Sequence, residues 1–268
     1  MTTDMGHANA ATSMMALTFS NVFDLRKTYF LVAGIAGIDP MQGTLGSPAW
    51  AKYLVDFGLQ WEIDSREKPG DWPSGFIAIG ATHPEDPPKF QYHTEAFELN
   101  SKLADIAFTL SKDVPLADSP EAEATRAKYT FTPANRPPQV LQCDTLSADT
   151  WWAGNLIGER AQAWTKQLTH NKGTYCTTQQ EDNATYAALI RAARAGRADS
   201  NRVAVLRAGA DFDRPYAGQS VFESLSSFET AGGVPPAIEN LYRAGLPLVT
   251  NINKNWQTWR DGVPERLP

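Results

Sequence analysis

Residues 202–213 (RVAVLRAGADFD) constrain the fold of this chain more than any other segment. The Val-Ala-Val-Leu run is apolar and does not alternate with polar residues, which is typical of a strand buried on both faces. Beyond it come a cation (Arg207), three small residues and two acids (Asp211 and Asp213). Because ligands of open α/β sheets bind at the carboxyl ends of strands, this run predicts a strand that delivers acids to a ligand site. A partly buried carboxyl group has a raised pKa and can act as an acid near neutral pH. The alternative interpretation is a strand that ends in a solvated, Asp-rich turn.

The composition is that of a globular α/β protein and argues against several function classes. The chain has 268 residues, of which 42% are hydrophobic, enough to bury a sizeable core. A net charge of -6 argues against nucleic-acid binding, which depends on neutralising phosphates with Lys and Arg. No run approaches the roughly 18 apolar residues needed to span a bilayer. Residues 1–10 lack the basic region and apolar core of a signal peptide.

Strand-like and helix-like segments alternate along the chain. The predicted strands are 28–36, 49–64 (a long strand or a hairpin arm), 139–143, 174–178 and 202–213. The predicted helices are 6–19, 101–111, 119–129, 155–168, 182–195, 236–244 and 248–259. This alternation predicts an α/β fold with helices on both faces of a mixed or mostly parallel sheet. No linker divides the chain, so we expect a single domain over residues 1–268.

The cysteines and histidines do not suggest a metal site. Cys143 and Cys176 end or lie within β-type runs, where they can be core thiols or form one disulfide; we expect free buried thiols. The four histidines show no paired spacing with each other or with a cysteine, so no metal ligation is expected.

Three further segments are candidates for ligand contacts. Gly34 and Gly37 would allow a ligand to approach the backbone, although a tight strand-to-helix turn explains them equally well. Residues 179–183 (QQEDN) place acids at the start of a helix, where capping by Asp182 or Asn183 is the alternative.

The third segment is a loop in which two tryptophans, Trp151 and Trp152, follow Asp149. Exposed tandem tryptophans are costly unless they pack or stack on a flat ligand; core packing is the alternative for either one. No Gly-x-Ser-x-Gly elbow, Walker loop or Rossmann fingerprint is present, which argues against covalent serine, kinase-like and dinucleotide chemistry.

Five motifs distributed over nearly the whole chain together resemble the purine nucleoside permease family. They are MGHANAA (residues 5–11), FLVAGIAGIDP (30–40), GTLGSPAWAKYLVDFGLQWEIDSRE (43–67), QEDNAT (180–185) and LRAGADFDRP (206–215). The order of these motifs is similar to that in the nucleoside phosphorylase and nucleosidase superfamily. The resemblance implies one three-layer domain, with helices flanking a mixed central sheet.

The resemblance also implies a nucleoside site. Strand-end glycines would face the phosphate or water, an acid at a helix start would hold the ribose hydroxyls, and an acid after the last strand would address purine N7. The residues carried over as catalytic are Asp211 and Arg207. Those carried over as nucleoside contacts are Gly34, Gly37, Asp149, Trp151, Gln180, Glu181, Asp182 and Asn183, with the ribose acid being either Glu181 or Asp182. The implied reaction is dissociative cleavage of the N-glycosidic bond, with Asp211 as the acid.

Several positions depart from the pattern of the superfamily. Val32 and Ile35 stand where phosphorylases commonly place an Arg and a Ser that bind phosphate. Asp4 stands where a glycine beside the anion is usual, and its charge would repel phosphate. Related proteins carry a His at the position of Ala153 and an Asn at that of Asp211. These departures favour water over phosphate as the nucleophile, or no turnover at all. We expect no cofactor other than phosphate as a disfavoured co-substrate.

The superfamily fold starts with a strand and a helix that would precede this sequence, so the resemblance implies an N-terminally incomplete domain. A signal peptide on such a segment would imply a periplasmic or secreted protein, and its absence a cytoplasmic one. The resemblance also implies a homo-oligomer. Three hypotheses follow: a protein that cleaves or binds purine nucleosides, a non-catalytic nucleoside-binding component of transport, and a truncated, inactive remnant.

Overall fold

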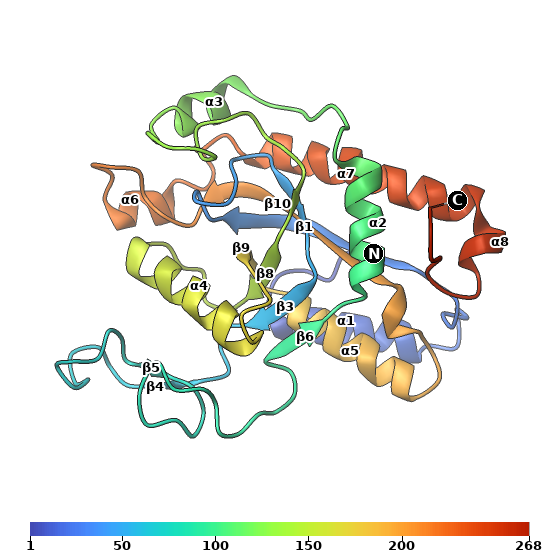
Figure 1. Cartoon of the computed structure of the whole chain (residues 1–268), viewed down its shortest axis with the longest axis horizontal. Coiled ribbons are helices and arrows are strands. Elements are labelled where there is room, and N and C mark those ends of the chain that lie inside the picture. Colours follow the sequence, from blue (N-terminus) through green and yellow to red (C-terminus); the bar gives the residue numbers. More distant parts are fainter. Residues whose placement is uncertain (268) are drawn as a thin grey trace.

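The computed structural model describes residues 1–267, and a mixed eight-stranded sheet lies at its centre (Figure 1). The strand order is β6-β3-β8-β9-β1-β10-β2-β7. The strands are β1 Phe30–Ile38, β2 Pro48–Trp50, β3 Tyr53–Asp56, β6 Ala96–Glu98, β7 Leu141–Gln142, β8 Asp144–Ser147, β9 Tyr175–Gln179 and β10 Val203–Phe212. Two short strands, β4 Trp61–Glu62 and β5 Phe76–Ile77, form a separate antiparallel pair.

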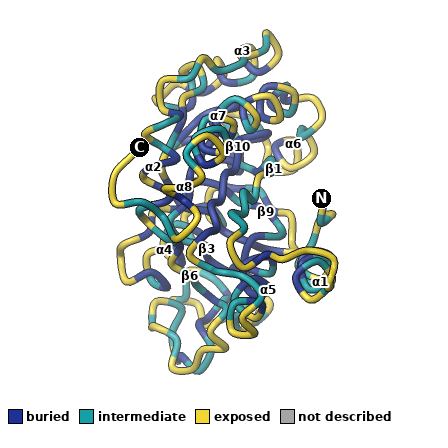
Figure 2. Tube along the Cα trace, turned by 90° about the vertical axis from the view of Figure 1, so that its right-hand side faces the viewer, coloured by how far each residue is buried: buried dark blue, intermediate teal, exposed yellow. Residues whose placement is uncertain are grey.

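Helices cover both faces of the sheet. The covering helices are α1 His7–Phe19 and α5 Asp182–Arg194 on one face, and α2 Ser101–Ser111, α4 Asn155–Leu168 and α7 Val234–Lys254 on the other. Shorter helical segments are α3 Pro120–Arg126, α6 Val221–Ser226, α8 Trp256–Trp259 and the 3-10 turn η1 Ser200–Arg202. Figure 2 shows the buried sheet in dark blue between helices whose outer sides are exposed. The predicted three-layer α/β architecture is confirmed. No helix within residues 1–267 is both long enough and apolar enough to cross a membrane.

Local sequence accounts for three of these helices. The predicted bounds of α2 and α4 are confirmed at both ends. Helix α3 begins after Ser119, whose hydroxyl accepts a hydrogen bond from the Ala122 N–H (3.0 Å), and Pro120 occupies its first position. A side-chain cap followed by proline satisfies or removes N–H groups that would otherwise lack a partner.

Strands β1 and β10 are neighbours in the interior of the sheet and run parallel. All ten residues of β10 are buried, as the apolar run predicts. The register shifts once: Ala36 lies opposite Gly209, but Gly37 lies opposite Asp211, so β10 carries one extra residue, Ala210. Such a β-bulge changes the direction of the side chain that follows it. The predicted delivery of acids to the carboxyl end of this strand is confirmed by Asp211 and the adjacent Asp213.

The expectation of one long strand or hairpin arm over residues 49–64 is wrong. Strand β2 pairs with β10 and β7, whereas β3 pairs with β6 and β8 on the other side of the sheet. The chain crosses between these positions at Lys52, and the N–H groups of Lys52 and Tyr53 donate to Asp144 Oδ1 (2.9 and 2.8 Å). A carboxylate from a distant segment thus replaces the ladder partners that a continuous strand would need. Asp144 also begins β8, a strand that the sequence pattern did not indicate.

The two helices predicted at 236–244 and 248–259 are joined in one continuous helix, α7, with Pro247 in its interior, and residues 256–259 form the separate short helix α8. Proline removes one helical hydrogen bond and usually ends or kinks a helix. Here Ala244, Leu248 and Ile252 continue the apolar face on both sides of the proline and are buried in one core cluster. Packing therefore extends the helix through a residue that would interrupt it in isolation.

The expectation of free thiols is also wrong, because Cys143 and Cys176 form a disulfide with their Cα atoms 5.6 Å apart. Cys143 directly precedes β8, and Cys176 lies in the neighbouring parallel strand β9. A sequence separation of 33 residues gives no indication of this proximity. The bond links the two strands whose carboxyl ends lead to the Trp151 loop and to helix α5.

Replacing both cysteines, Cys143→Ala with Cys176→Ala, should lower the free energy of unfolding by about 3–4 kcal/mol. The estimate follows from releasing a closed loop of about 33 residues in the unfolded chain. Urea unfolding of the variant and of the oxidised wild-type protein measures the difference. Two thiols titrating in the unfolded, unreduced wild-type protein would contradict the bond itself.

Candidate functional site

A cavity of about 740 Å³ opens beside β1, at the carboxyl ends of β1 and β10 and at the start of α5. Ligand sites of small molecules commonly fall within about 300–1,000 Å³. Seven of the ten residues predicted for the site line this cavity: Gly34, Gly37, Trp151, Gln180, Glu181, Arg207 and Asp211. The walls are completed by the N-terminal segment, helix α1 and Phe228.

Arg207 reaches from β10 across β1 to the start of α5. The guanidinium passes over Gly34, where an added Cβ would lie 2.3 Å from Nη1. Its Nε donates to Asp182 Oδ2 (3.0 Å), and its Nη2 approaches Glu181 Oε2 (3.0 Å). Nη1 also donates to the Ile35 carbonyl oxygen (3.3 Å). Burial disfavours the charged guanidinium, but Asp182 and Glu181 outweigh this effect and raise the pKa of Arg207 above its usual value. Arg207 therefore remains a cation and fixes two acids in place.

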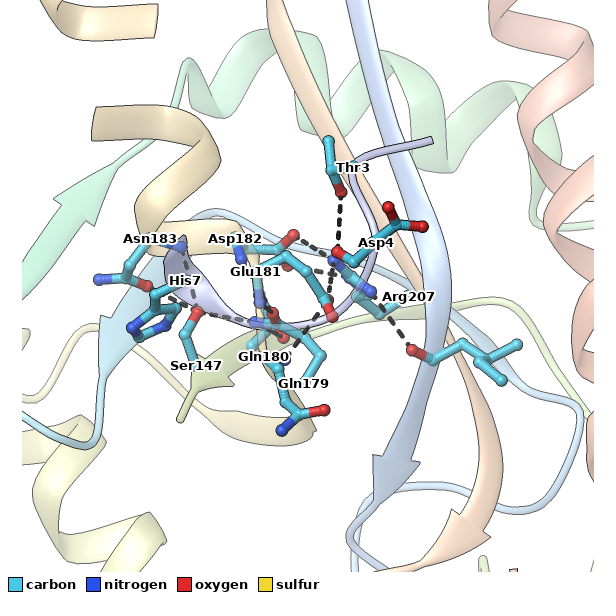
Figure 3. A network of polar contacts seen from close by, with 12 residues as sticks. Thr3, Asp4, His7, Ser147, Gln179, Gln180, Glu181, Asp182, Asn183 and Arg207 are labelled. Carbon is cyan, nitrogen blue, oxygen red and sulfur yellow. Dashed lines mark hydrogen bonds and ion pairs between the residues drawn. The ribbon is translucent and has the colours of Figure 1, made fainter. Parts of the chain in front are cut away.

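The two candidate ribose acids have different positions (Figure 3). Asp182 is fully buried against Arg207 and does not line the cavity, whereas Glu181 keeps a partly accessible carboxylate at the cavity wall. Of the two acids, Glu181 is therefore the one that a ligand in the cavity could reach.

The expected capping of α5 by Asp182 or Asn183 is wrong. Gln179 Oε1 accepts from the N–H groups of Glu181 and Asp182 (2.7 and 2.9 Å), and Ser147 Oγ accepts from the Asn183 N–H (3.1 Å). The cap comes from the ends of β8 and β9, so the acids are left to interact with Arg207 and the cavity. Gly196, just beyond the end of α5, adopts the left-handed conformation that follows many helices.

Asp211 is a buried acid of the cavity whose carboxyl group has neither a cation nor a hydrogen-bond donor as a partner within residues 1–267. Its carboxylate lies over Gly37, with both oxygens within 3.9 Å of where a Cβ at that position would be. No hydrogen-bond donor in residues 1–267 pairs with this carboxylate. Burial raises the pKa of Asp211 to about 7. Near neutral pH, a large share of this group is therefore protonated and able to donate a proton to a ligand.

Asp213 also lines the cavity but belongs to a buried polar network. Tyr175 donates to its Oδ2 (2.6 Å), and Arg214 lies between Asp213 and Asp39, 2.8 Å from the latter. Burial, and then the charge of Asp39, raise the pKa of Asp213 to about 8, although Arg214 and Tyr175 act in the opposite direction. The roles of Asp39 and Tyr175 were missed from the sequence, since only the fold brings these strand ends together.

The tandem tryptophans both line the cavity, but Trp152 is buried in the core and Trp151 is exposed. Trp152 is buried and packs against Phe57 and Tyr175. Trp151 is 44% exposed, lines the cavity and meets Phe228 edge to face, with ring centroids 4.9 Å apart. Trp151 and Phe228 thus form an aromatic wall that a flat ligand could contact. Phe228 gave no signal in the sequence.

Besides Asp182, two further predicted contact residues do not reach the cavity. Asp149 accepts from the His7 N–H at the start of α1 (2.7 Å), and Asn183 is held by Ser147 and the Thr94 carbonyl. Both stabilise the segments around the site and are absent from its lining.

The lining carries little positive charge for an anion. Val32, Ile35 and Asp4 all lie at the cavity wall. Arg207 is the only cationic side chain among the lining residues, and it is already engaged by Glu181 and Asp182. Residues 1–267 also contain no cluster of three or more potential metal ligands.

Gly34→Ala should strongly reduce ligand affinity and lower stability by about 1–3 kcal/mol, because the added methyl group collides with the Arg207 guanidinium. Gly70→Ala is a matched control, since no atom lies within 4 Å of a Cβ at that position. Urea unfolding and calorimetric titration with inosine measure the two effects. Equal behaviour of the two variants would show that the passage of Arg207 over Gly34 is unimportant.

Comparison with known proteins shows the family to which this chain belongs. The sequence model of the purine nucleoside permease (NUP) family matches residues 1–264. A protein of Schizosaccharomyces pombe named "Probable purine nucleoside permease" is 41% identical over 268 residues, covering 97% of this chain and 76% of the relative. A purine nucleoside permease of Candida albicans is 39% identical over 260 residues, covering 96% of this chain and 64% of the relative. The chain thus spans about two thirds to three quarters of the length of these relatives.

The fold is shared with solved nucleosidases. The structure of futalosine hydrolase from Helicobacter pylori strain 26695 superposes with a TM-score of 0.51 and 14% identity, over 92% of this chain and 77% of that protein. The expected nucleoside phosphorylase-like fold is therefore confirmed. At this identity the similarity concerns the fold alone.

Proposed function

The chain belongs to the purine nucleoside permease family, and we propose that its cavity binds a purine nucleoside and cleaves the N-glycosidic bond. The observation that carries the proposal is that a protonatable acid, a fixed carboxylate and an exposed tryptophan line one cavity. Asp211, Glu181 and Trp151 reach it from three separate segments of the chain. Each supplies a group that this reaction needs.

Asp211 would act on the base. Its protonated carboxyl group can donate to N7, which turns the purine into a better leaving group as the glycosidic bond breaks. The electron pair of that bond goes to the base, and the ribose gains oxocarbenium character. A positioned acid of this kind typically contributes about 10²–10⁴-fold to the rate.

Glu181 would act on the sugar. Its carboxylate can accept hydrogen bonds from two ribose hydroxyls, and Arg207 holds it in one orientation. Negative charge beside the developing oxocarbenium ion stabilises the transition state more than the ground state. Trp151 and Phe228 would contact the flat faces of the purine.

Water is the proposed nucleophile: its oxygen forms the new bond to the anomeric carbon as the bond to the base breaks, and its proton passes to solvent. Asp211, which has given its proton to N7, is reprotonated from solvent. Val32 and Ile35 offer no charged donors, and Asp4 adds a carboxylate to the same wall. Phosphate would have to enter a cavity whose single cationic side chain is already paired, which Coulomb repulsion from the acids disfavours.

Incubation of the pure protein with inosine or adenosine, with and without phosphate, tests the proposal. Free base released without phosphate supports hydrolysis. Release that requires phosphate would retain cleavage but overturn the choice of water. No release at saturating nucleoside would reject catalysis.

A second candidate is a nucleoside-binding component of transport that does not turn over its ligand. The names of the family relatives favour it. Such a protein would bind inosine or adenosine at equilibrium and release no base over many hours. Equilibrium dialysis followed by chromatography of the recovered nucleoside distinguishes the two candidates.

A further inference from the structure

Helix α4 holds the segment 57–95 against the body of the molecule. This segment leaves the sheet after β3, contains the short strands β4 and β5, and returns at β6 (Figure 1). Arg160 Nη2 donates to Gln60 Oε1, and two helical turns further on Gln167 Nε2 donates to the Asp86 carbonyl oxygen (2.5 Å). Residues seven positions apart lie on the same face of a helix, so one face of α4 supports the segment.

Arg160 is a half-buried cation that is paired with aromatic rings. Its Cζ atom lies 4.2 Å from the ring centre of Phe57 and 3.9 Å from that of Phe76. Within residues 1–267, no carboxylate lies within 4 Å of its guanidinium nitrogens. Burial lowers the pKa of Arg160 to about 9, although the charge of Glu62 acts in the opposite direction. The face of an aromatic ring attracts a cation, so the two rings stabilise the guanidinium in this position.

Phe57 connects this cation to the wall of the nucleoside cavity. Its ring meets that of Trp152 with centroids 5.8 Å apart, and Trp152 also meets Tyr175 at 6.2 Å. Trp152 is buried, lines the cavity and directly follows the exposed Trp151. A chain of contacts therefore runs from Arg160 on α4 through one aromatic ring to the tandem tryptophans.

We propose that Arg160 is a positioning residue of the nucleoside site, which holds the Phe57 ring against Trp152 and thereby fixes the tandem tryptophans in the cavity wall. This role rests on the proposed function, because it requires that a purine contacts this wall. Arg160 is not among the residues that line the cavity, so it acts through Phe57 and not on the ligand. Arginine suits the position because its guanidinium is planar and lies flat between two rings, whereas the ammonium group of lysine is compact and strongly hydrated.

Arg160→Met should weaken inosine binding about tenfold, which is part of what a stacked aromatic ring contributes to binding a base. The rate of base release at saturating inosine should stay within twofold of wild type, because Arg160 contacts neither Asp211 nor Glu181. Arg160→Lys keeps the charge but not the plane, so its affinity should remain at least fivefold below that of wild type. Lys166→Met, an exposed position on the same helix, is the matched control and should bind inosine like wild type. Calorimetric titration and base-release assays measure these effects.

Two phenylalanine variants separate this role from a general loosening of the segment. Phe57→Leu and Phe76→Leu each remove one ring from Arg160, but the ring contacts of Trp152 include Phe57 and not Phe76. Phe57→Leu should therefore reproduce the tenfold loss of affinity, whereas Phe76→Leu should stay within threefold of wild type. The double variant Arg160→Met with Phe57→Leu should bind no more weakly than either single variant, because both break one chain of contacts.

Fluorine NMR of protein labelled with fluorotryptophan observes Trp152 directly and without nucleoside, with Trp152→Phe assigning its resonance. The resonance should shift in Arg160→Met and stay unchanged in Lys166→Met. Because no nucleoside is present, the measurement tests the contact chain separately from the proposed function, which fails by itself if wild-type protein neither binds nor cleaves inosine. An unmoved Trp152 resonance, an Arg160→Met affinity within twofold of wild type, or equal losses in Phe57→Leu and Phe76→Leu would each overturn the role of Arg160.

Discussion

Asp211→Asn should lower the rate of base release by about 10²–10⁴-fold while leaving the fold intact. Asparagine keeps the shape of the side chain and can still donate a hydrogen bond to a purine, but it cannot transfer a proton. The affinity for inosine should therefore change much less than the turnover. In the wild-type protein, turnover should fall about tenfold per pH unit above the Asp211 pKa of about 7, as the acid form disappears.

Although Asp211→Asn should lower turnover, it should raise the free energy of unfolding at alkaline pH. The folded-state pKa of Asp211 is raised from 3.8 to about 7, so the native state binds the proton more tightly than the unfolded chain does. This group's contribution to stability is fully present below pH 3.8 and is lost as the pH rises through about 7. The loss amounts to roughly 4 kcal/mol at alkaline pH. Asp211→Asn should therefore be more stable than wild type at pH 8 and nearly equal to it at pH 4.

Urea unfolding at both pH values, together with base-release assays, measures these effects. Asp261→Asn is the matched control, because this aspartate is exposed, pairs only with surface cations and is not among the residues that line the cavity. Turnover within threefold of wild type in Asp211→Asn would remove the acid from the mechanism. If the free energies of unfolding of Asp211→Asn and wild type differ by the same amount at pH 4 and at pH 8, the carboxyl group is not buried as described.

Arg207→Met should cost about 3–5 kcal/mol of stability and abolish nucleoside binding, because it leaves Glu181 and Asp182 without their cation. Removing one partner of a buried ion pair is much more harmful than losing an exposed pair. The double variant Arg207→Met with Asp182→Asn should recover part of the stability, since one uncompensated charge is then absent. It should not recover binding, because Glu181 would still lack its support.

The control for this prediction is Arg243→Met. Arg243 pairs with Glu239 on the exposed side of α7, where an ion pair contributes at most about 1 kcal/mol. Urea unfolding and inosine titration of the three variants complete the comparison. A loss of 1 kcal/mol or less in Arg207→Met would show that the cluster is hydrated and that Arg207 does not organise the site.

The fold was largely predictable because apolar patterns report burial directly. The strand that became β10 and the helices α2 and α4 were recognised from such patterns. The errors share one cause: a distant partner decided the local structure. Asp144 interrupts the predicted strand at Lys52, and the packing of α7 carries it through Pro247.

In the candidate site too, features visible in the local sequence were predicted, and features that depend on distant partners were missed. Asp211 and Glu181 were identified because their chemistry and their place after a strand or before a helix are visible locally. The pairing of Arg207 with Asp182, the network of Asp213 and the contact between Phe228 and Trp151 depend on segments far apart in the chain. No spacing in the sequence encodes them.

The extra residue in β10 has a consequence for comparing sequences within the family. Four steps along β10 separate Arg207 from Asp211, but only three along β1 separate Gly34 from Gly37. Loss of Ala210 would make the two counts equal and turn the carboxyl group of Asp211 toward the other side of the sheet. A relative with a one-residue gap at this point would keep the strand and the arginine, yet it should have lost the carboxyl group that faces the cavity.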